Sequence, residues 1–260
     1  MPDAHVKMSK IVGQMICHYG VDFIAYALRS IAPFVDELFV FYTDIPSHGT
    51  PSPLPCPDSP EQMRAAILGA GVGDKLRLIE GRWNGEGEHR NQIFNYTSPG
   101  DLIIVADADE VWDSKNLQAC IDLMNAMPDK KFLKVRMTNL WRSFNFICTD
   151  PMTQDRLVRV GASGGIVWSP TSALPEYPDI WHLGYARKPV DIEYKLSCHG
   201  HIGSIFPEWY QSKFLAWTPA NGVTDCHPDC RDFWYPKSFD KNLLPDDLKS
   251  HSYFNLDIIA

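Results

Sequence analysis

The first half of the chain alternates between short, almost continuous apolar runs and longer segments with a single apolar face. The apolar runs cover residues 10–17, 38–43, 75–81 and 101–109. Runs of this length predict strands that are buried on both faces, as in a parallel sheet. Between the first two runs, the apolar residues of 22–32 recur at the spacing of one helical face. Strand, helix and strand in this order predict parallel βαβ units.

Local signals predict where the first helices begin and end. Asp22 is expected to cap the first helix, and Pro33 is expected to end it. Ser59 and Gln62 have the spacing of a capping box, which predicts a second helix that ends near Gly69. A further short helix is expected over residues 89–96.

The second half has a different pattern, which begins after a helix that Asp113 is expected to cap and that runs to about Met127. Its strand-like segments are short or alternate between apolar and polar residues, which predicts an antiparallel or mixed extension of the sheet. The strand-like segments cover residues 131–137, 156–161 and 165–169. Short helices are expected over residues 189–197 and 207–217. We therefore predict one α/β domain over residues 1–260, with a mixed, mostly parallel central sheet flanked by helices and an antiparallel or irregular C-terminal region.

Composition narrows the class of protein. The chain has 260 residues, of which 45% are hydrophobic and 22% are charged, so it is expected to fold around a sizeable core. A net charge of -8 excludes a uniformly basic clamp for nucleic acid. No apolar run approaches the roughly 18 residues of a membrane span, which predicts no transmembrane segment. The N-terminus lacks an apolar signal region and the seven cysteines are an odd number, so we expect a cytoplasmic protein with mostly free thiols.

The most informative segment is the end of the fourth apolar run, where Asp107, Asp109 and Glu110 lie close together. Ligands of parallel sheets bind at the carboxyl ends of the strands. Because alternate residues of an extended chain share a face, Asp107 and Asp109 are expected to face one ligand. Mg²⁺ and Mn²⁺ are typically held by one or two carboxylates together with the phosphates of a substrate. The alternative is a polar loop that closes the strand.

The order of elements that ends in GDLIIVADADEVWD (100–113) resembles the nucleotide-sugar-binding half of glycosyltransferases with the glycosyltransferase-A (GT-A) fold. In that family a D-x-D motif follows a strand and holds a divalent metal on the diphosphate of the sugar nucleotide. Residues 86–101, with an Arg-Asn pair on a short helix, are similar to the family-2-like stretch before that strand. Residues 156–161 and 180–187 resemble the R-L-x-R and H-x-G-Y segments of many such enzymes. The resemblance covers residues 9–200.

This resemblance implies a metal-dependent glycosyltransferase, with a nucleotide-sugar-binding half at residues 9–127 and an acceptor-binding half at 128–260. It implies Mn²⁺ or Mg²⁺ as the metal, a nucleotide sugar as the donor with UDP as the expected nucleotide, and inversion on transfer to an acceptor hydroxyl. The expected metal ligands are Asp107, Asp109 and His182, because GT-A enzymes often add a C-terminal histidine to the two carboxylates. A structural, hydrogen-bonded histidine is the alternative for His182.

The resemblance also indicates residues around the donor. In the resembling fold the end of the second strand lies near the uracil or ribose, so Asp44 is expected to accept hydrogen bonds there and His18 to line the same pocket. Arg90 is expected to neutralise phosphate and Asn91 to orient the base, with Asp107 beside them. Ordinary loop and helix-capping roles are the alternative for each of these residues.

An inverting transfer needs a carboxylate that faces the acceptor hydroxyl. Many relatives carry a His-Glu pair after the strand that corresponds to residues 165–169, but here residues 170–173 are Pro-Thr-Ser-Ala. The general base is therefore expected to be one of Asp155, Glu176 and Asp179, and the sequence does not choose among them.

Cysteines and histidines toward the C-terminus indicate a second kind of metal site. Cys226 and Cys230 have a spacing found in structural zinc sites. Cys198, or one of His199 and His201, would complete a Zn²⁺ site with them. Loop cysteines and surface histidines are the alternative, and the same two histidines are also alternative ligands for the diphosphate metal.

Two other functions are alternatives to a glycosyltransferase. A nucleotidyl- or phosphotransferase would apply the strand-end carboxylates to a nucleotide triphosphate, although the chain has no G-x-x-x-x-G-K-[ST] loop. A zinc-stabilised binding module would use only the C-terminal cysteines and histidines. The acceptor stays open among a glycan, a lipid-linked sugar, a protein and a hydroxymethylated DNA base. The net charge opposes DNA, whereas the basic segment 130–136 and Arg187 favour a local contact with it.

Overall fold

Strand β1 (Ile11–Cys17) lies within a group of parallel strands. It pairs with β2 (Glu37–Tyr42) on one side and with β4 (Leu102–Asp107) on the other, and β3 (Leu76–Glu80) pairs with the far edge of β2. These strands lie within two residues of the bounds that the apolar runs predict, so these predictions are confirmed. The structure, a computed structural model, describes residues 9–47, 51–161, 180–198, 200 and 202–260.

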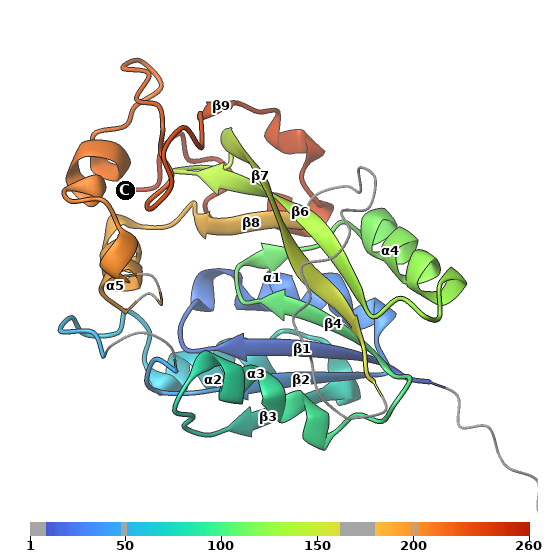
Figure 1. Cartoon of the computed structure of the whole chain (residues 1–260). Coiled ribbons are helices and arrows are strands. Elements are labelled where there is room, and N and C mark those ends of the chain that lie inside the picture. The colour runs from blue at the N-terminus through green and yellow to red at the C-terminus, as the bar shows by residue number, and fades with distance from the viewer. Residues whose placement is uncertain (1–8, 48–50, 162–179, 199, 201) are drawn as a thin grey trace, which may run out of the picture.

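The sheet continues beyond β4 with antiparallel neighbours (Figure 1). β7 (Phe146–Arg159) runs antiparallel to β4, and β6 (Phe132–Trp141) runs antiparallel to β7. β8 (Ile180–Tyr185) lies parallel to β6, β5 (Glu110–Val111) pairs with β8, and β9 (Lys237–Ser238) pairs with β7. Within the described residues the strand order is β3-β2-β1-β4-β7-β6-β8-β5. The predicted α/β class, with a mixed sheet that is parallel at its centre and flanked by helices, is confirmed.

Helices cover both faces of the parallel strands. Helices α1 (Val21–Ile31), α2 (Pro60–Leu68) and α4 (Ser114–Ala126) supply the buried residues that pack on one face. The other face packs against η3 (Gln92–Asn95), which directly follows α3 (Glu86–Asn91). The strands are therefore buried on both faces, which explains why their sequences are almost continuously apolar.

The helix-start signals at Ser59 and Asp113 are confirmed, but two predicted segments have different bounds. Ser59 forms the predicted capping box with Gln62, and Asp113 caps α4 by accepting hydrogen bonds from backbone N–H groups of the first turn. The helix predicted over 89–96 begins earlier, as α3, and its second part is the 3₁₀ helix η3. The strand predicted over 156–161 is the end of the longer β7.

The prediction that Asp22 caps α1 is wrong. The cap position is Gly20, whose φ of 124° favours glycine, and Asp22 lies in the first turn of the helix. The capping carboxylate is that of Asp58, which accepts from Gly20 N at 2.6 Å and from Val21 N at 3.1 Å. Asp58, which is distant in the sequence, therefore takes the capping role that was expected of Asp22.

The helix predicted over 189–197 is confirmed as α5 (Pro189–Cys198). The segment predicted as a helix over 207–217 contains the shorter π-helical turn η5 (Tyr210–Leu215). The remaining helical elements are α6 (Asp246–Lys249) and the 3₁₀ turns η1 (Ala32–Phe34), η2 (Gly73–Lys75), η4 (Ile202–Ser204) and η6 (Lys241–Leu243). None of the helices in the described part of the chain has both the length and the apolar character needed to cross a bilayer.

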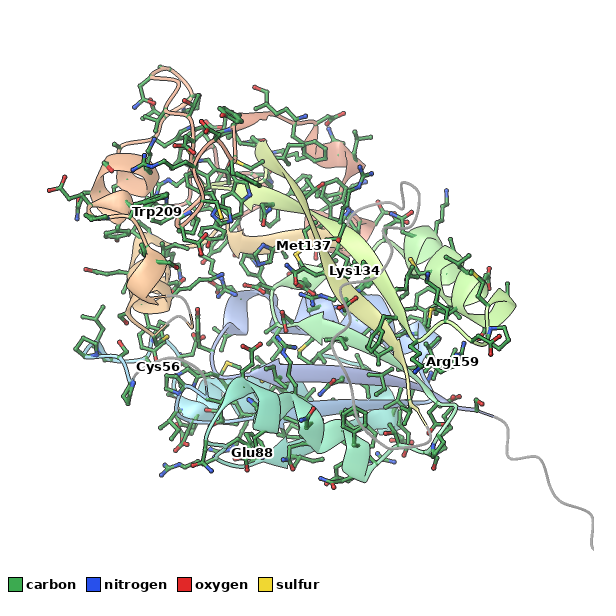
Figure 2. All side chains as sticks on the ribbon, in the orientation of Figure 1. Cys56, Glu88, Lys134, Met137, Arg159 and Trp209 are labelled. Carbon is green, nitrogen blue, oxygen red and sulfur yellow. The ribbon has the colours of Figure 1, made fainter. Side chains whose placement is uncertain are left out.

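Aromatic residues of the second half form a core. Trp141 is fully buried, and its ring packs edge to face, at centroid distances of 5.6–6.4 Å, against the rings of Trp209, Phe214, Trp217 and Trp234. Figure 2 shows Trp209 in this C-terminal part, well apart from Glu88 on the opposite side of the molecule. This aromatic cluster holds the C-terminal segment against β6 and β8.

Candidate functional site

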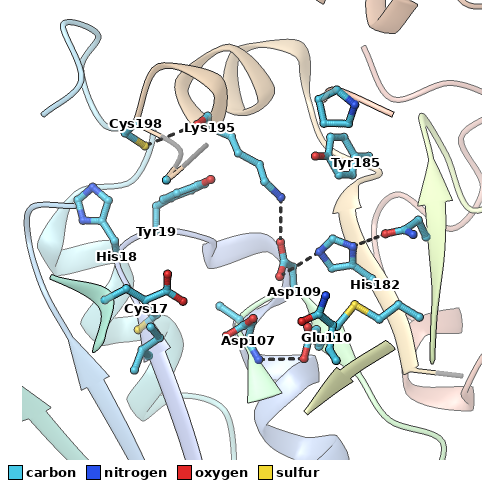
Figure 3. Close-up of a pocket in the computed structure, with 18 of the residues that line it drawn as sticks. Cys17, His18, Tyr19, Asp107, Asp109, Glu110, His182, Tyr185, Lys195 and Cys198 are labelled. Atoms are coloured by element: carbon cyan, nitrogen blue, oxygen red, sulfur yellow. Dashed lines mark hydrogen bonds and ion pairs between the residues drawn. The ribbon is translucent and has the colours of Figure 1, made fainter. Parts of the chain in front are cut away.

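A pocket with a volume of about 560 Å³ opens at the carboxyl ends of β1 and β4 (Figure 3). Both parallel strands and the C-terminal part contribute to its wall, so it lies where ligands of parallel sheets bind. Its lining includes His18, Tyr19, Arg90, Asp107, Asp109, Glu110, Asn139, Arg156, His182, Arg187, Lys195 and the segment 227–230.

Asp109 and His182 face each other across this pocket. Strand β8 carries His182 to β5, where Glu110 is paired with His182 and Leu183 N donates to Asp109 O at 2.8 Å. The His182 Nε2 atom lies 3.7 Å from Asp109 Oδ1. Nδ1 on the other side of the ring donates to Asn139 Oδ1, so the lone pair of the neutral imidazole is on Nε2 and faces the carboxylate.

Cationic side chains surround Asp109. Arg187 NH2 lies 3.3 Å and Lys195 Nζ 3.8 Å from Asp109 Oδ2. Burial alone would raise the pKa of Asp109. His182 when it is protonated, together with the charges of Lys195 and Arg187, outweighs burial and holds the pKa of this carboxyl below its usual range. Burial lowers the pKa of His182 to about 4, against the opposite effect of Asp109. The pocket therefore holds an ionised carboxylate beside a neutral imidazole at neutral pH.

Asp107 has a different environment. Its Oδ1 accepts from Arg90 NH2 and its Oδ2 from Arg156 NH2, both at 3.1 Å. Arg156 also donates through Nε to Glu110 at 2.7 Å, and Glu110 accepts from the backbone N of Asp107 at 3.2 Å. Burial raises the pKa of Glu110 to about 7, although Arg156 opposes this shift. Arg156 is only 6% exposed, so its guanidinium group links the carboxyl groups of Asp107 and Glu110 inside the protein.

Of the residues expected around the donor, the structure brings His18 and Arg90 to the pocket together with Asp107. The His18 ring bonds Thr43 O at 3.0 Å and Tyr194 OH at 2.6 Å. The other two residues lie elsewhere. Asp44 forms a two-point pair with Arg82 at 2.8 and 2.6 Å, and Asn91 is exposed on α3; neither lines the pocket.

The candidate bases are not brought to the site within the described residues. Asp155 lies on β7 between Gln154 and Arg156, which both line the pocket. Asp155 itself does not line the pocket, and burial raises its pKa. The candidates Glu176 and Asp179 lie outside the described residues, as do the segment 165–169, His199 and His201.

Sequence reasoning missed the groups that act on Asp109 and His182 from other elements. Lys195 comes from α5, a helix predicted without a function, and Asn139 comes from the middle of β6. The sequence indicates Arg187 only as a contact for DNA, but this residue is 3% exposed and its guanidinium lies over the ring of Tyr19. No motif or spacing in residues 189–198 marks Lys195 as a site residue.

No protein-family model and no curated protein sequence matches the chain. The solved structures to which it is similar include three at 16% identity: S. aureus TarS 1-349, glucosyl-3-phosphoglycerate synthase from Mycobacterium tuberculosis in complex with Mn²⁺, UDP-glucose and phosphoglyceric acid, and the mannosyltransferase PcManGT from Pyrobaculum calidifontis in complex with GDP-Man and Mn²⁺. The matches cover 50%, 52% and 49% of this chain, with TM-scores of 0.35, 0.37 and 0.38. They span 36%, 45% and 35% of those chains, less than half of each. Likenesses of this size concern only part of the fold, so we infer function from the side chains of the pocket.

Proposed function

We propose that the chain is a metal-dependent glycosyltransferase that moves a sugar from a nucleotide-sugar donor, with UDP as the nucleotide, to an acceptor hydroxyl with inversion. The observation that carries this proposal is the pair formed by Asp109 and His182 at the end of a parallel strand, 3.7 Å apart, in a pocket lined by arginine and lysine. A volume of about 560 Å³ is in the range of small-molecule sites. Residues 9–127 are proposed to bind the nucleotide sugar and residues 128–260 the acceptor.

The donor atoms fit a divalent cation. A carboxylate oxygen and a neutral imidazole nitrogen are both ligands that Mn²⁺ accepts, and carboxylates also suit Mg²⁺. The Asn139 amide fixes the His182 ring so that Nε2 is available, an outer-shell contact typical of metal-binding histidines. Asp109 and His182 would hold the cation, with Asp107 beside them. When bound, the cation offsets the diphosphate charge and stabilises the departing nucleoside diphosphate as a Lewis acid.

The cationic side chains have a separate task. Arg90 and Arg156 lie on the Asp107 side of the pocket, and Arg187 and Lys195 lie on the Asp109 side. A diphosphate between these two groups would accept hydrogen bonds from guanidinium and ammonium donors, which are strong when both partners are charged. These residues bind and orient the donor.

We propose that one of Glu176 and Asp179 takes the proton of the acceptor hydroxyl, because Asp155 is not among the residues that line the pocket. The acceptor is an alcohol of a glycan, a lipid-linked sugar, a protein or a hydroxymethylated DNA base. A panel of such acceptors, each tested with the best donor, identifies it. Conversion of Glu176 and of Asp179 to the amides then shows which carboxylate the transfer step needs.

Calorimetry with UDP and Mn²⁺, followed by donor hydrolysis over a panel of nucleotide sugars, tests the function. Asp109→Asn and His182→Gln should weaken Mn²⁺-dependent UDP binding by more than the about 10–100-fold that loss of an outer-shell partner costs. Asp74→Asn, which changes an exposed carboxylate far from the pocket lining, is the matched control and should bind as the parent does.

Two outcomes contradict the proposal. If no nucleoside diphosphate binds with metal present, the pocket is not a donor site. If nucleotide triphosphates are turned over and nucleotide sugars are not, the carboxylates serve nucleotidyl or phosphoryl transfer. A His182→Gln protein that loses stability but keeps full affinity for UDP and Mn²⁺ would make His182 a structural residue.

A further inference from the structure

A second group of ligand atoms lies on the wall of the same pocket, in the segment that follows Cys226. One atom each from His227, Asp229 and Cys230 lies within 4.8 Å of the other two. His227 Nδ1 is 2.8 Å from Asp229 Oδ1, and Cys230 Sγ is 3.4 Å from the same oxygen. These residues are partly buried and line the pocket, and they share no side chain with the pair formed by Asp109 and His182.

The Nδ1 atom of His227 is the part of the ring nearest to this turn. It lies 3.3 Å from the backbone N of Asp229 and 3.1 Å from that of Cys230. A carboxylate oxygen of Asp229 lies 2.8 Å from the same Nδ1 atom. A proton on Nδ1 makes this contact a hydrogen bond, and a metal ion bound by both groups would take the place of that proton.

The segment is held in place at both ends. Cys226 N donates to Trp234 O at 2.9 Å, and Trp209 Nε1 donates to Cys226 O at 3.1 Å. Phe206 N donates to Pro228 O at 2.9 Å. The His227 ring packs edge to face on Trp234, with 4.5 Å between the ring centroids. The three ligand side chains therefore project from a backbone that the surrounding fold already fixes.

We propose that His227, Asp229 and Cys230 bind one Zn²⁺ ion, in a site separate from that of Asp109. Imidazole, carboxylate and thiolate are the three ligand types that zinc takes in proteins, at about 2.0–2.3 Å. Ligand atoms on a tetrahedron of that size lie about 3.3–3.8 Å apart, and the two observed distances to Asp229 Oδ1, 2.8 and 3.4 Å, are within about 0.5 Å of that range. Because all three residues line the pocket, a further ligand would reach the ion from there.

This site differs from the zinc site expected from the spacing of Cys226 and Cys230. The Cys226 side chain is fully buried in the aromatic cluster around Trp141, and its Sγ donates to Val223 O at 3.5 Å. The ligand on that side is His227. Binding converts the Cys230 thiol to a thiolate, and the displaced proton leaves to solvent, so affinity rises with pH.

The experiment measures the metal itself and does not depend on the proposed transferase activity. The reduced full-length protein is loaded with Zn²⁺, passed over a weak chelating resin and analysed by mass spectrometry for bound metal. We expect one equivalent of zinc in the parent and at least a tenfold weaker zinc affinity in Cys230→Ser and in His227→Gln. Loading with Co²⁺ should give a thiolate-to-cobalt charge-transfer absorption in the parent, and this absorption should vanish in Cys230→Ser.

Two matched controls separate this site from the rest of the pocket. Cys56→Ser, which removes another partly exposed thiol, should keep the zinc and the cobalt absorption. Asp109→Asn should also keep them, even if it abolishes UDP binding. Circular dichroism and thermal unfolding show that each variant is folded.

Equal zinc affinity in the parent and Cys230→Ser would overturn the proposal. So would a parent protein that retains no zinc and shows no thiolate absorption with cobalt; in that case the contact between His227 Nδ1 and Asp229 is a hydrogen bond alone. Loss of zinc in Asp109→Asn alone would place the ion in the other site.

Discussion

The substitution Gly184→Ala tests the geometry of the pair formed by Asp109 and His182 without touching either side chain. Gly184 lies two residues after His182 on β8, on the same face of the strand. A Cβ atom added there would lie 2.5 Å from His182 Nε2, 2.7 Å from His182 Cε1 and 2.8 Å from Lys195 Nζ. The glycine therefore leaves the space into which the imidazole and the ammonium group extend.

The expected magnitude follows from these distances. Ordinary contacts between non-bonded heavy atoms are about 3.5–4.0 Å, so the ring must move by about 1 Å. Lys195 can turn its flexible end away, but the His182 ring is held by Asn139 on its other side. A displacement of about 1 Å at a reacting group costs about 100-fold in rate, or about 2.7 kcal/mol in the barrier. The cost in folding free energy should be about 1–3 kcal/mol, as for other overpacked sites.

The assay compares Mn²⁺-dependent UDP affinity, donor turnover and thermal unfolding in the parent, Gly184→Ala and Gly203→Ala. Gly203 is the control, because a Cβ atom added there meets nothing within 4 Å. The reasoning is refuted if Gly184→Ala keeps parental UDP affinity and turnover while remaining folded. It is also refuted if both glycine variants lose function to the same degree.

Three further predictions concern other parts of the fold. Arg156→Met should lower the free energy of unfolding by about 3–5 kcal/mol in denaturant titrations, because it leaves the buried Glu110 without its charged partner, and a change below 1 kcal/mol would contradict this role. Ser59→Ala should cost about 1 kcal/mol by removing the capping box of α2, seen as a lower midpoint of thermal unfolding with unchanged UDP binding. His251 is buried and accepts a hydrogen bond from Tyr253 N, and burial lowers its pKa from 6.5. On acidification the unfolded chain therefore binds a proton at this histidine at a higher pH than the folded chain does. Stability should therefore fall as pH drops from 7.5 to 5.5, and the fall should be smaller in His251→Gln; equal falls would show that other groups cause it.

Elements defined by local patterns were predictable from the sequence. The capping box at Ser59, the cap at Asp113 and the apolar run of β4 depend on residues within a few positions of one another. The backbone geometry of one turn or one strand determines what such residues must be. The mixed sheet followed from the change of pattern after the first half.

Features that depend on distant contacts were not predictable in this way. The cap of α1 comes from Asp58, which bonds Gly20 N at 2.6 Å from the other side of a long proline-rich loop. The first part of β7 contains Asp150 and Pro151, which weaken a strand pattern. The pairing with β6 is interrupted there, between Thr149 and Thr153, yet β7 continues on both sides of the interruption. Tertiary pairing overrides local preference in both cases.

In the candidate site, too, residues set by local sequence were predictable and residues set by distant contacts were not. Asp107 and Asp109 could be chosen from the sequence because they directly follow an apolar strand. His182 was expected only from the resemblance, and the pairing of β5 with β8 brings it next to Asp109 and Glu110. The orientation of Asp155 depends on which face of β7 lines the pocket, and that depends on a register containing shifts within β6. A shift of one residue exchanges the two faces of a strand, so no sequence pattern could decide it.

The charges around Asp109 have a consequence for how ligands bind. The carboxylate already has cationic neighbours, since Arg187 lies at 3.3 Å and Lys195 at 3.8 Å. A divalent cation that arrives alone must compete with both groups for the same oxygens and leaves two buried positive charges without a partner, which is costly. A diphosphate that arrives alone would be repelled by the ionised carboxylate of Asp109. Under the proposed function, a cation and a diphosphate that bind together would avoid both costs: the cation would pair with the carboxylate and the phosphate oxygens with Arg187 and Lys195, so every charge would keep a partner. The affinity for UDP should therefore depend on Mn²⁺, and the affinity for Mn²⁺ should depend on UDP by the same factor, because the two bindings share one coupling free energy.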